Sequence, residues 1–306
     1  MNREPMKRKN IVGGLRNFCS IGIFELWCFL ALFPISSSSL LGARLLSAGK
    51  SPQYNNSNCD SLLICPGEDL LYEVSYAGIK LGRIRIKTQG LDSIAGLPQY
   101  HATAFVDSYD GIPFVDLHVI DSTHMDSLYY SRGFHAWEKQ HDQWVEEASI
   151  YDSGNHNIFI ERTLHNDLTS PALGPSIYDT VENIKNAFHD GLSLLFFARA
   201  QVRHQMTISV PTVVYAKEGT TEFHFCTERK MDEVDAIKDR KIRVVGLEGT
   251  AHFSGLYGMT GDFKGWFTDD VAAIPIRAQL GVFIGNVNIE LIWWHRHNWE
   301  PPAVPK

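Results

Sequence analysis

The stretch from Gly67 to Ile86 places apolar or aromatic residues at a period of two in both of its parts. Apolar or aromatic side chains fall at every second position of its first part: Leu70, Tyr72, Val74 and Tyr76. Because successive side chains of a β-strand point to opposite faces, this spacing predicts a strand with one apolar face. Glycines at Gly78 and Gly82 mark a turn region, and the alternation then resumes. The stretch therefore predicts a β-hairpin.

Strand-like segments recur at short spacing in two halves of the chain, 67–164 and 204–294. Turn-forming residues separate them, as in the stretch Asp110-Gly111-Ile112-Pro113. No helical spacing of apolar residues competes with the alternation in the first half. Both halves are therefore predicted to be antiparallel β-structure.

The region between the halves, 176–199, shows apolar residues at helical spacing instead. A first helix is predicted from four such residues: Ile177, Val181, Ile184 and Phe188. A second helical run, from Gly191 to Arg199, follows Asp190, which is predicted to be its N-cap. This run is apolar on most of its circumference, which predicts burial on more than one side.

These patterns predict a mostly β fold, with a curved antiparallel sheet or an incomplete β-barrel and one helical insertion packed on it. A curved sheet with an apolar face needs a cover, and the second helical run is apolar enough to provide one. A single β-rich domain is predicted over 67–298. A flexible tether rich in Ser, Asn, Gly and Pro is predicted before it over 44–66, and an irregular tail after it over 299–306.

The N-terminal region, residues 1–43, has the layout of a secretory signal peptide. Basic residues come first, a compact apolar run follows over 26–35, and small residues follow that run. The alternative is an uncleaved membrane anchor, for which the apolar run is short. We expect cleavage, with a mature N-terminus between Ser36 and Lys50, and a location in the periplasm or cell envelope.

The charge balance changes once this region is set apart. The whole chain carries a formal net charge of −7, and residues 1–40 hold five basic and two acidic side chains, a net of +3. The remainder therefore carries −7 − 3 = −10. An acidic body without a basic stripe argues against nucleic acid as a partner, and against binding to anionic lipid headgroups by charge alone.

The cysteines fit an exported protein. Cys59 and Cys65 lie close together just before the first predicted strand, and in an oxidising compartment they are predicted to form a disulfide. The alternative is a pair of free thiols in a loose N-terminal arm. Cys226, between Phe225 and Thr227 in a predicted strand, is expected to be a small buried hydrophobic residue.

Residues able to bind metals or to catalyse reactions are numerous, but their spacing is not that of a known site. The pair His295 and His297 provides two ligands where a divalent metal needs three or four, and His135 and His141 are similarly placed beside tryptophans. Five aspartates between residues 107 and 126 fall mostly at turns, where they cap backbone groups: Asp107, Asp110, Asp116, Asp121 and Asp126. No nucleophile or phosphate-binding motif is present in the sequence. We therefore predict no catalytic residues, no metal site and no cofactor.

One charged residue stands out by its position. Arg199 ends the apolar helical run, and we expect a structural role for it, at the helix C-terminus and paired with a buried acid such as Asp190 or Glu290.

Three blocks of sequence resemble the bacterial envelope family known as domain of unknown function 3108. The first runs from Gly67 through the hairpin to Gly82, and the second from Asp190 to Arg199. The third starts at Gly265 and includes Trp266-Phe267-Thr268-Asp269-Asp270, Ile274-Pro275-Ile276, Ile284-Gly285 and Glu290-Leu291. The resemblance implies an exported, mostly β domain without an established activity, so no catalytic residue is carried over from it.

The function predicted from the sequence is that of a non-catalytic cell-envelope protein that binds an apolar small molecule or lipid, or a partner protein of the envelope. A curved sheet of this kind can enclose an apolar pocket. Five residues are predicted to line it: Tyr72, Tyr76, Leu192, Leu195 and Phe196. The alternatives are a hydrolase of envelope polymers that uses carboxylates or a metal, and a structural scaffold with a filled core.

Overall fold

The computed structural model describes Cys59 and residues 62–94, 96–113, 115–214, 216–232, 236–237, 240–256, 259–282 and 285–302. The predicted signal peptide, most of the predicted tether and the end of the tail lie outside the described residues, so export remains a prediction. Within the described part of the chain, no helix is long and apolar enough to cross a membrane.

The described residues form fourteen strands and one α-helix. The first eight strands are β1 (Glu68–Tyr76), β2 (Ile79–Ile94), β3 (Leu97–Ser108), β4 (His118–Met125), β5 (Ser131–Gln140), β6 (Gln143–Asp152), β7 (Asn157–His165) and β8 (Ile177–Val181). The helix α1 (Gly191–Gln201) follows. The remaining strands are β9 (Met206–Val214), β10 (Lys217–Asp232), β11 (Ile242–Leu256), β12 (Met259–Thr268), β13 (Pro275–Gly281) and β14 (Asn286–His295).

All the strands belong to one sheet, in the order β8-β7-β6-β5-β4-β3-β2-β1-β14-β13-β12-β11-β10-β9. Short turns join most neighbouring strands, and strands joined in this way run antiparallel. The first and last strands pair with each other, so the two halves of the chain form one continuous sheet. Within the described residues β8 and β9 are its edges, and the sheet is not closed into a barrel. The predicted fold, a mostly antiparallel sheet with a packed helix, is confirmed.

The predicted hairpin is β1 and β2. Tyr76 pairs with Ile79 across the two-residue turn Ala77-Gly78, where both residues have positive φ, 49° and 83°. Two positive φ values are typical of the tight turns that match the twist of paired strands. Leu70 and Tyr72 are buried on the face that the alternation predicted.

The helix α1 begins at a capping box. The carboxylate of Asp190 accepts hydrogen bonds from the backbone N–H groups of Leu192 and Ser193 at 2.9 and 2.7 Å, and the Ser193 side chain accepts one from the Asp190 N–H. The hydroxyl of Thr123 on β4 donates to the same carboxylate, which fixes the helix start to the sheet. The N-cap predicted from the sequence is thus confirmed.

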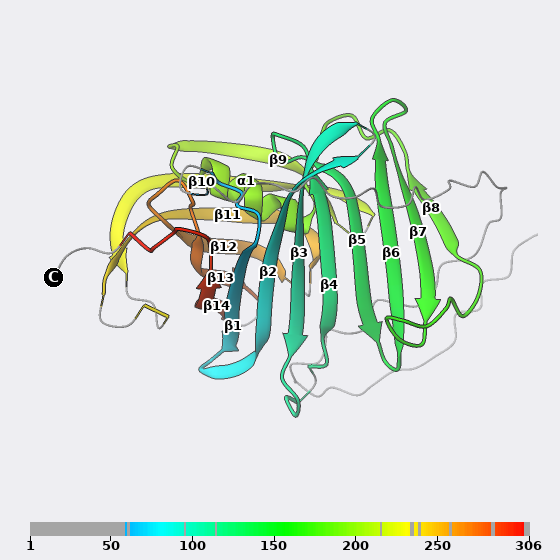
Figure 1. Cartoon of the computed structure of the whole chain (residues 1–306), viewed down its shortest axis with the longest axis horizontal. Coiled ribbons are helices and arrows are strands. Elements are labelled where there is room, and N and C mark those ends of the chain that lie inside the picture. The colour runs from blue at the N-terminus through cyan, green and yellow to red at the C-terminus, as the bar shows by residue number, and fades with distance from the viewer. Residues whose placement is uncertain are drawn as a thin grey trace, which may run out of the picture. The chain divides into compact units, whose positions relative to one another are not determined.

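The helix α1 lies between the two halves of the sheet, in contact with β4 and β9 (Figure 1). Leu192 and Phe196 pack into one apolar cluster, with residues of β1 to β4, β11, β13 and β14. Phe197 and Ala198, on another side of the helix, pack into a second cluster with residues of β9 to β12. Burial on more than one side, predicted from the apolar circumference, is confirmed.

The helix predicted from Ile177 to Phe188 is wrong. Residues 177–181 form the edge strand β8 instead, paired with β7, and residues 182–190 contain no helix. Ile177 is 68% exposed, whereas Ile184 and Phe188 pack against Ile158 and Ile160 of β7. The helical spacing failed as a predictor because β-branched and aromatic residues of this segment suit an edge strand, and pairing with β7 decides their conformation.

The segment 182–190 connects the two edges of the sheet. The N–H of Ile184 donates to His156 O in the β6–β7 turn at 2.8 Å, and Ser131 N at the start of β5 donates to Phe188 O at 2.9 Å. On the other side, His189 exchanges backbone hydrogen bonds with Pro211 and Val213 of β9, each of 2.9 Å. The segment therefore covers part of the β9 edge and holds it close to the first half.

Candidate functional site

A buried cluster of three charged side chains joins the ends of several elements. Glu68 begins β1, Arg199 lies in the last turn of α1, and Arg296 follows β14. Arg199 donates to both oxygens of the Glu68 carboxylate, from Nη1 at 2.7 Å and from Nη2 at 3.1 Å. Arg296 donates to the same carboxylate through Nη1. All three side chains are at most 4% exposed, so the ion pairs are shielded from solvent.

The same guanidinium groups bind backbone carbonyls of the segment before β1. Leu63 O accepts from Arg199 Nη2 and from Arg296 Nη1, each at 3.2 Å. Arg296 Nη2 also donates to Cys59 O at 3.0 Å and to Leu62 O. The flexible tether predicted over 44–66 is therefore wrong for residues 62–66, because buried arginines hold this segment against the domain.

Cys59 and Cys65 are joined by a disulfide in the structure, with Cα atoms 5.3 Å apart. Both residues are buried. The bond closes a loop around the carbonyls that Arg296 binds, so the covalent link and the charge cluster hold the same segment.

The acid that neutralises Arg199 is Glu68, and neither of the two predicted partners. Asp190 caps the opposite end of α1, about 13 Å away along the helix axis, and Glu290 pairs with Arg277 at 3.3 Å. Burial lowers the pKa of Arg199, but the charge of Glu68 outweighs this effect and the pKa is raised overall. For Arg296 burial prevails, and its pKa is lowered. With two guanidinium groups and one carboxylate, the cluster keeps an excess of one positive charge.

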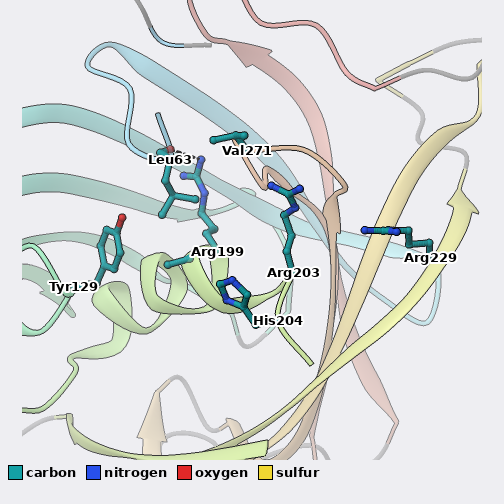
Figure 2. A pocket seen from close by; sticks show the side chains of 8 residues that line it. Leu63, Tyr129, Arg199, Arg203, His204, Arg229 and Val271 are labelled. Carbon is teal, nitrogen blue, oxygen red and sulfur yellow. Dashed lines mark hydrogen bonds between the residues drawn. The ribbon is translucent and has the colours of Figure 1, made fainter. Parts of the chain in front are cut away.

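An open depression of 410 Å³ lies beside this cluster (Figure 2). Its lining comes from the segment before β1, the β4–β5 loop, the end of α1, β10 and the loop after β12: Leu63, Tyr129, Arg199, Ala200, Arg203, His204, Arg229 and Val271. Figure 2 shows Arg199, Arg203 and His204 close together, with Arg229 farther along the depression. The described lining residues thus contain three arginines and no acid.

The acid that pairs with Arg203 and Arg229 is Asp269, which is not among the lining residues. Its carboxylate is 2.8 Å from Arg229 Nε and 3.9 Å from Arg203 Nε. The two arginine side chains are 67% and 44% exposed, so most of their N–H donors face solvent. Guanidinium groups in this state can bind a carboxylate or a phosphate with paired hydrogen bonds.

Four of the five residues predicted to line a pocket pack in or against the apolar core. Tyr72, Leu192 and Phe196 belong to the larger apolar cluster, and Leu195 packs at its border. Tyr72 also donates a hydrogen bond to Pro275 O at 2.9 Å, and burial raises its pKa far above the usual value. Tyr76 lies at the end of β1, half-buried. None of the five is among the residues that line the depression.

Of the aspartates between residues 107 and 126, three have partners that are near them in the sequence. Asp107 and Asp116 contact His118 at 2.9 and 3.1 Å, and Asp126 accepts hydrogen bonds from the N–H groups of a turn and from Arg132. The contacts of Asp126 are the turn-capping role that the sequence favoured, whereas Asp107 and Asp116 pair with a histidine.

The histidines considered as metal ligands and Cys226 lie on different elements of the sheet. His295 and His297 are exposed at the end of β14, and His135 is held by Glu146 on β6 at 2.8 Å. The prediction for Cys226 is wrong: this cysteine is exposed, because Phe225 occupies the inward position of β10 and the next residue faces outward.

The sequence analysis missed a group on the other face of the sheet. His101 on β3 and His124 on β4 are directly opposite in register, with ring centroids 4.3 Å apart. Asp92 on β2 lies 3.5 Å from His101. Burial lowers the pKa of both imidazoles, that of His124 to about 4 with a further contribution from His101. The three residues are far enough apart in sequence that only the strand register brings them together.

No protein-family model and no curated protein matches the chain. Among solved structures, the chain is similar to a beta-barrel-like protein of domain of unknown function 1849 from Brucella abortus, at 9% sequence identity and a TM-score of 0.46. The likeness covers 76% of this chain and 98% of the other. A likeness at this level assigns no family and no function, so the fold described above rests on the structure itself.

Proposed function

We propose that this protein is a non-catalytic protein of the cell envelope that binds an apolar ligand carrying an anionic group. The observation that carries the proposal is the composition of the depression in Figure 2, where the exposed guanidinium groups of Arg203 and Arg229 share the lining with the apolar side chains of Leu63 and Val271 and the ring of Tyr129. A carboxylate or phosphate would bind the arginines, and the apolar part of the same molecule would cover the other residues.

The charge distribution supports an anionic ligand. The chain beyond residue 40 has a net charge of −10, yet the described lining of the depression contains no acid. Glu68 holds Arg199 in place, while Arg203 and Arg229 share Asp269. A local positive site on an acidic body attracts small anions selectively, because extended polyanions are repelled by the surrounding surface.

The lining chemistry supports binding rather than catalysis. Among the described residues that form the depression, the side chains offer hydrogen-bond donors and apolar surface but no carboxylate base and no thiol or aliphatic hydroxyl nucleophile. His204 has its Nδ1 3.2 Å from Gln201 Oε1. The geometry therefore gives no support to the hydrolase alternative at this site.

Three features support export to the envelope. The N-terminal region has the order of a signal peptide, and the Cys59–Cys65 disulfide suits an oxidising compartment. The blocks that resemble domain of unknown function 3108 imply the same location. Membership of that family is part of this proposal.

A scaffold with a filled core is the second candidate, favoured by one specific observation. Helix α1 packs into apolar clusters on two sides, so the concave interior is occupied by side chains of the protein itself. In this packing Leu192, Leu195 and Phe196, which were expected to line an apolar pocket, contact other side chains of the protein.

The test is saturable binding of an anionic naphthalene sulfonate probe to the purified protein, followed by fluorescence. We expect one site per chain, with binding weakened by added salt. The double change Arg203→Gln and Arg229→Gln should weaken binding by about a hundredfold or more, since each of the two lost charge-assisted hydrogen bonds contributes about 1.5 kcal/mol or more. A neutral naphthalene analogue should bind more weakly and without salt dependence.

The matched control is Arg83→Gln, an exposed arginine on β2 that stacks on Tyr109. It should leave probe binding unchanged. Absence of saturable binding, or equal weakening by the control, would leave the scaffold candidate in place.

A further inference from the structure

We propose that Asp92, His101 and His124 form a binding site for a divalent transition-metal ion, with Zn²⁺ as the representative ion. One potential ligand atom from each residue lies within 4.8 Å of the others. Metal–ligand distances of 2.0–2.1 Å in a tetrahedral zinc site imply ligand–ligand separations of about 3.4 Å. The three side chains would therefore need to approach one another by roughly 1 Å, which small rotations about their χ angles provide.

The backbone places the three ligands on one face of the sheet. His101 and His124 are paired across β3 and β4, and Asp92 on β2 pairs with Gln99, two residues before His101. The neighbours Ala102 and Met125 point into the larger apolar cluster, so the imidazoles point to the opposite face. The site is thus independent of the depression and of helix α1, and built on rigid paired strands.

One imidazole atom lacks a partner. His124 Nδ1 is buried and has no hydrogen-bond partner among the residues that the structure describes. Such atoms are costly and rare in folded proteins, since burial removes the water that would otherwise satisfy them. Coordination of a cation by His124 would supply a partner at this position.

The neighbourhood leaves these three residues available as ligands. The next histidine on the same face, His135, is already held by Glu146 at 2.8 Å, and Glu146 is also 3.1 Å from His165. Asp92 and His101 keep 35% and 23% of their side-chain surface exposed, so an ion can enter and water can complete the coordination. The contact of 3.5 Å between Asp92 and His101 Nδ1 is longer than a strong hydrogen bond.

The ligand chemistry selects the class of ion. Two imidazole nitrogens and one carboxylate suit Zn²⁺, Cu²⁺ or Ni²⁺, whereas Ca²⁺ and Mg²⁺ require mainly oxygen ligands. Three protein ligands leave at least one position for water.

The test is a Zn²⁺ titration of the chelator-treated, purified protein, in competition with a chromophoric chelator. The background is Cys226→Ser, because the exposed thiol could bind the ion by itself. We expect one equivalent of Zn²⁺ to bind, a higher melting temperature with the ion, and no such effect of Mg²⁺. His101→Asn should lower the affinity at least tenfold, the lower limit seen when even an outer-shell partner of a metal is removed.

Asp92→Asn, at a more exposed position, should also lower the affinity and keeps the test valid if a histidine variant fails to fold. The control is the double change His295→Asn and His297→Asn, which should leave the affinity unchanged. Absence of stoichiometric Zn²⁺ binding overturns the proposal. So does binding that survives Asp92→Asn and His101→Asn, or that is lost in the His295 and His297 control.

Discussion

At the scale of single residues, the Glu68 carboxylate is the acceptor that two buried arginines share. It forms ion pairs with both Arg199 and Arg296, and these arginines also bind the backbone of the segment before β1. A buried ion pair adds little stability relative to apolar residues of the same shape, but removing one partner leaves a buried charge uncompensated. The cluster therefore defines how the ends of β1, α1 and β14 meet.

Glu68→Gln should lower the free energy of unfolding by about 3–5 kcal/mol, because two buried guanidinium groups would then face each other without a counter-charge. Chemical denaturation with an unchanged m-value is the measurement. Lys264→Met, which removes the exposed pair of Lys264 with Glu248, serves as the control and should have no measurable effect. A loss for Glu68→Gln below 1 kcal/mol or so would show that water reaches the cluster.

His189 gives the structure a dependence on pH. It is fully buried, its Nδ1 lies 3.0 Å from Tyr129 O, and burial lowers its pKa to about 4. The folded state holds this imidazole neutral, whereas the unfolded chain takes up a proton near pH 6.5. Its contribution to stability is thus fully present above pH 6.5 and is lost as the pH falls to about 4, by up to about 3 kcal/mol.

The measurement is the free energy of unfolding between pH 7 and pH 4 for the natural chain and for His189→Phe. The variant should lose less stability than the natural chain over this interval, although other acidic and basic groups titrate in both. Parallel curves for the two proteins would show that His189 is protonated in the folded state.

At the scale of elements, the hairpin β1–β2 and the helix α1 follow from local sequence. Tyr72→Asp should lower the free energy of unfolding by several kcal/mol, because it places a charge in the apolar cluster between the sheet and α1. Tyr72→Phe should lower the free energy of unfolding by about 1 kcal/mol, since it removes only the hydrogen bond to Pro275 O. Equilibrium unfolding of both variants is the check, and equal small losses would mean that this face of β1 is open to solvent.

The sequence predicts elements well where local and tertiary preferences agree. The alternation in β1 and the Asp190 cap of α1 encode their own conformation. The segment 177–188 has helical spacing as well as β-branched residues, and the available edge of β7 decides in favour of β8. A single-sequence pattern carries no information about such an edge.

The candidate sites were harder to predict for a related reason. The depression combines residues that are widely separated in sequence, among them Leu63, Arg199 and Arg229. Asp92, His101 and His124 meet through the register of three strands, which alternation alone does not determine. Arg199 was recognisable from the sequence as a charge at the end of an apolar helix, but its partner Glu68 lies 131 positions away.

At the scale of the whole described domain, the two halves of the chain form one open sheet around α1. Pairing of β1 with β14 joins the halves at one side, and the segment 182–190 connects the edges β8 and β9 at the other. Among the described residues, α1 packs into apolar clusters on two sides, and the ligand site that we propose is the depression at the end of α1.

The most direct measurement is an NMR titration of the purified protein, labelled with ¹⁵N at the arginine side chains, with dodecyl phosphate below its micellar concentration. The Nε–H signals of Arg203 and Arg229 should shift and saturate together, while the signal of Arg83 on β2 remains in place. Shifts that increase without saturation, or that affect Arg83 equally, would contradict the assignment of a binding site at the end of α1.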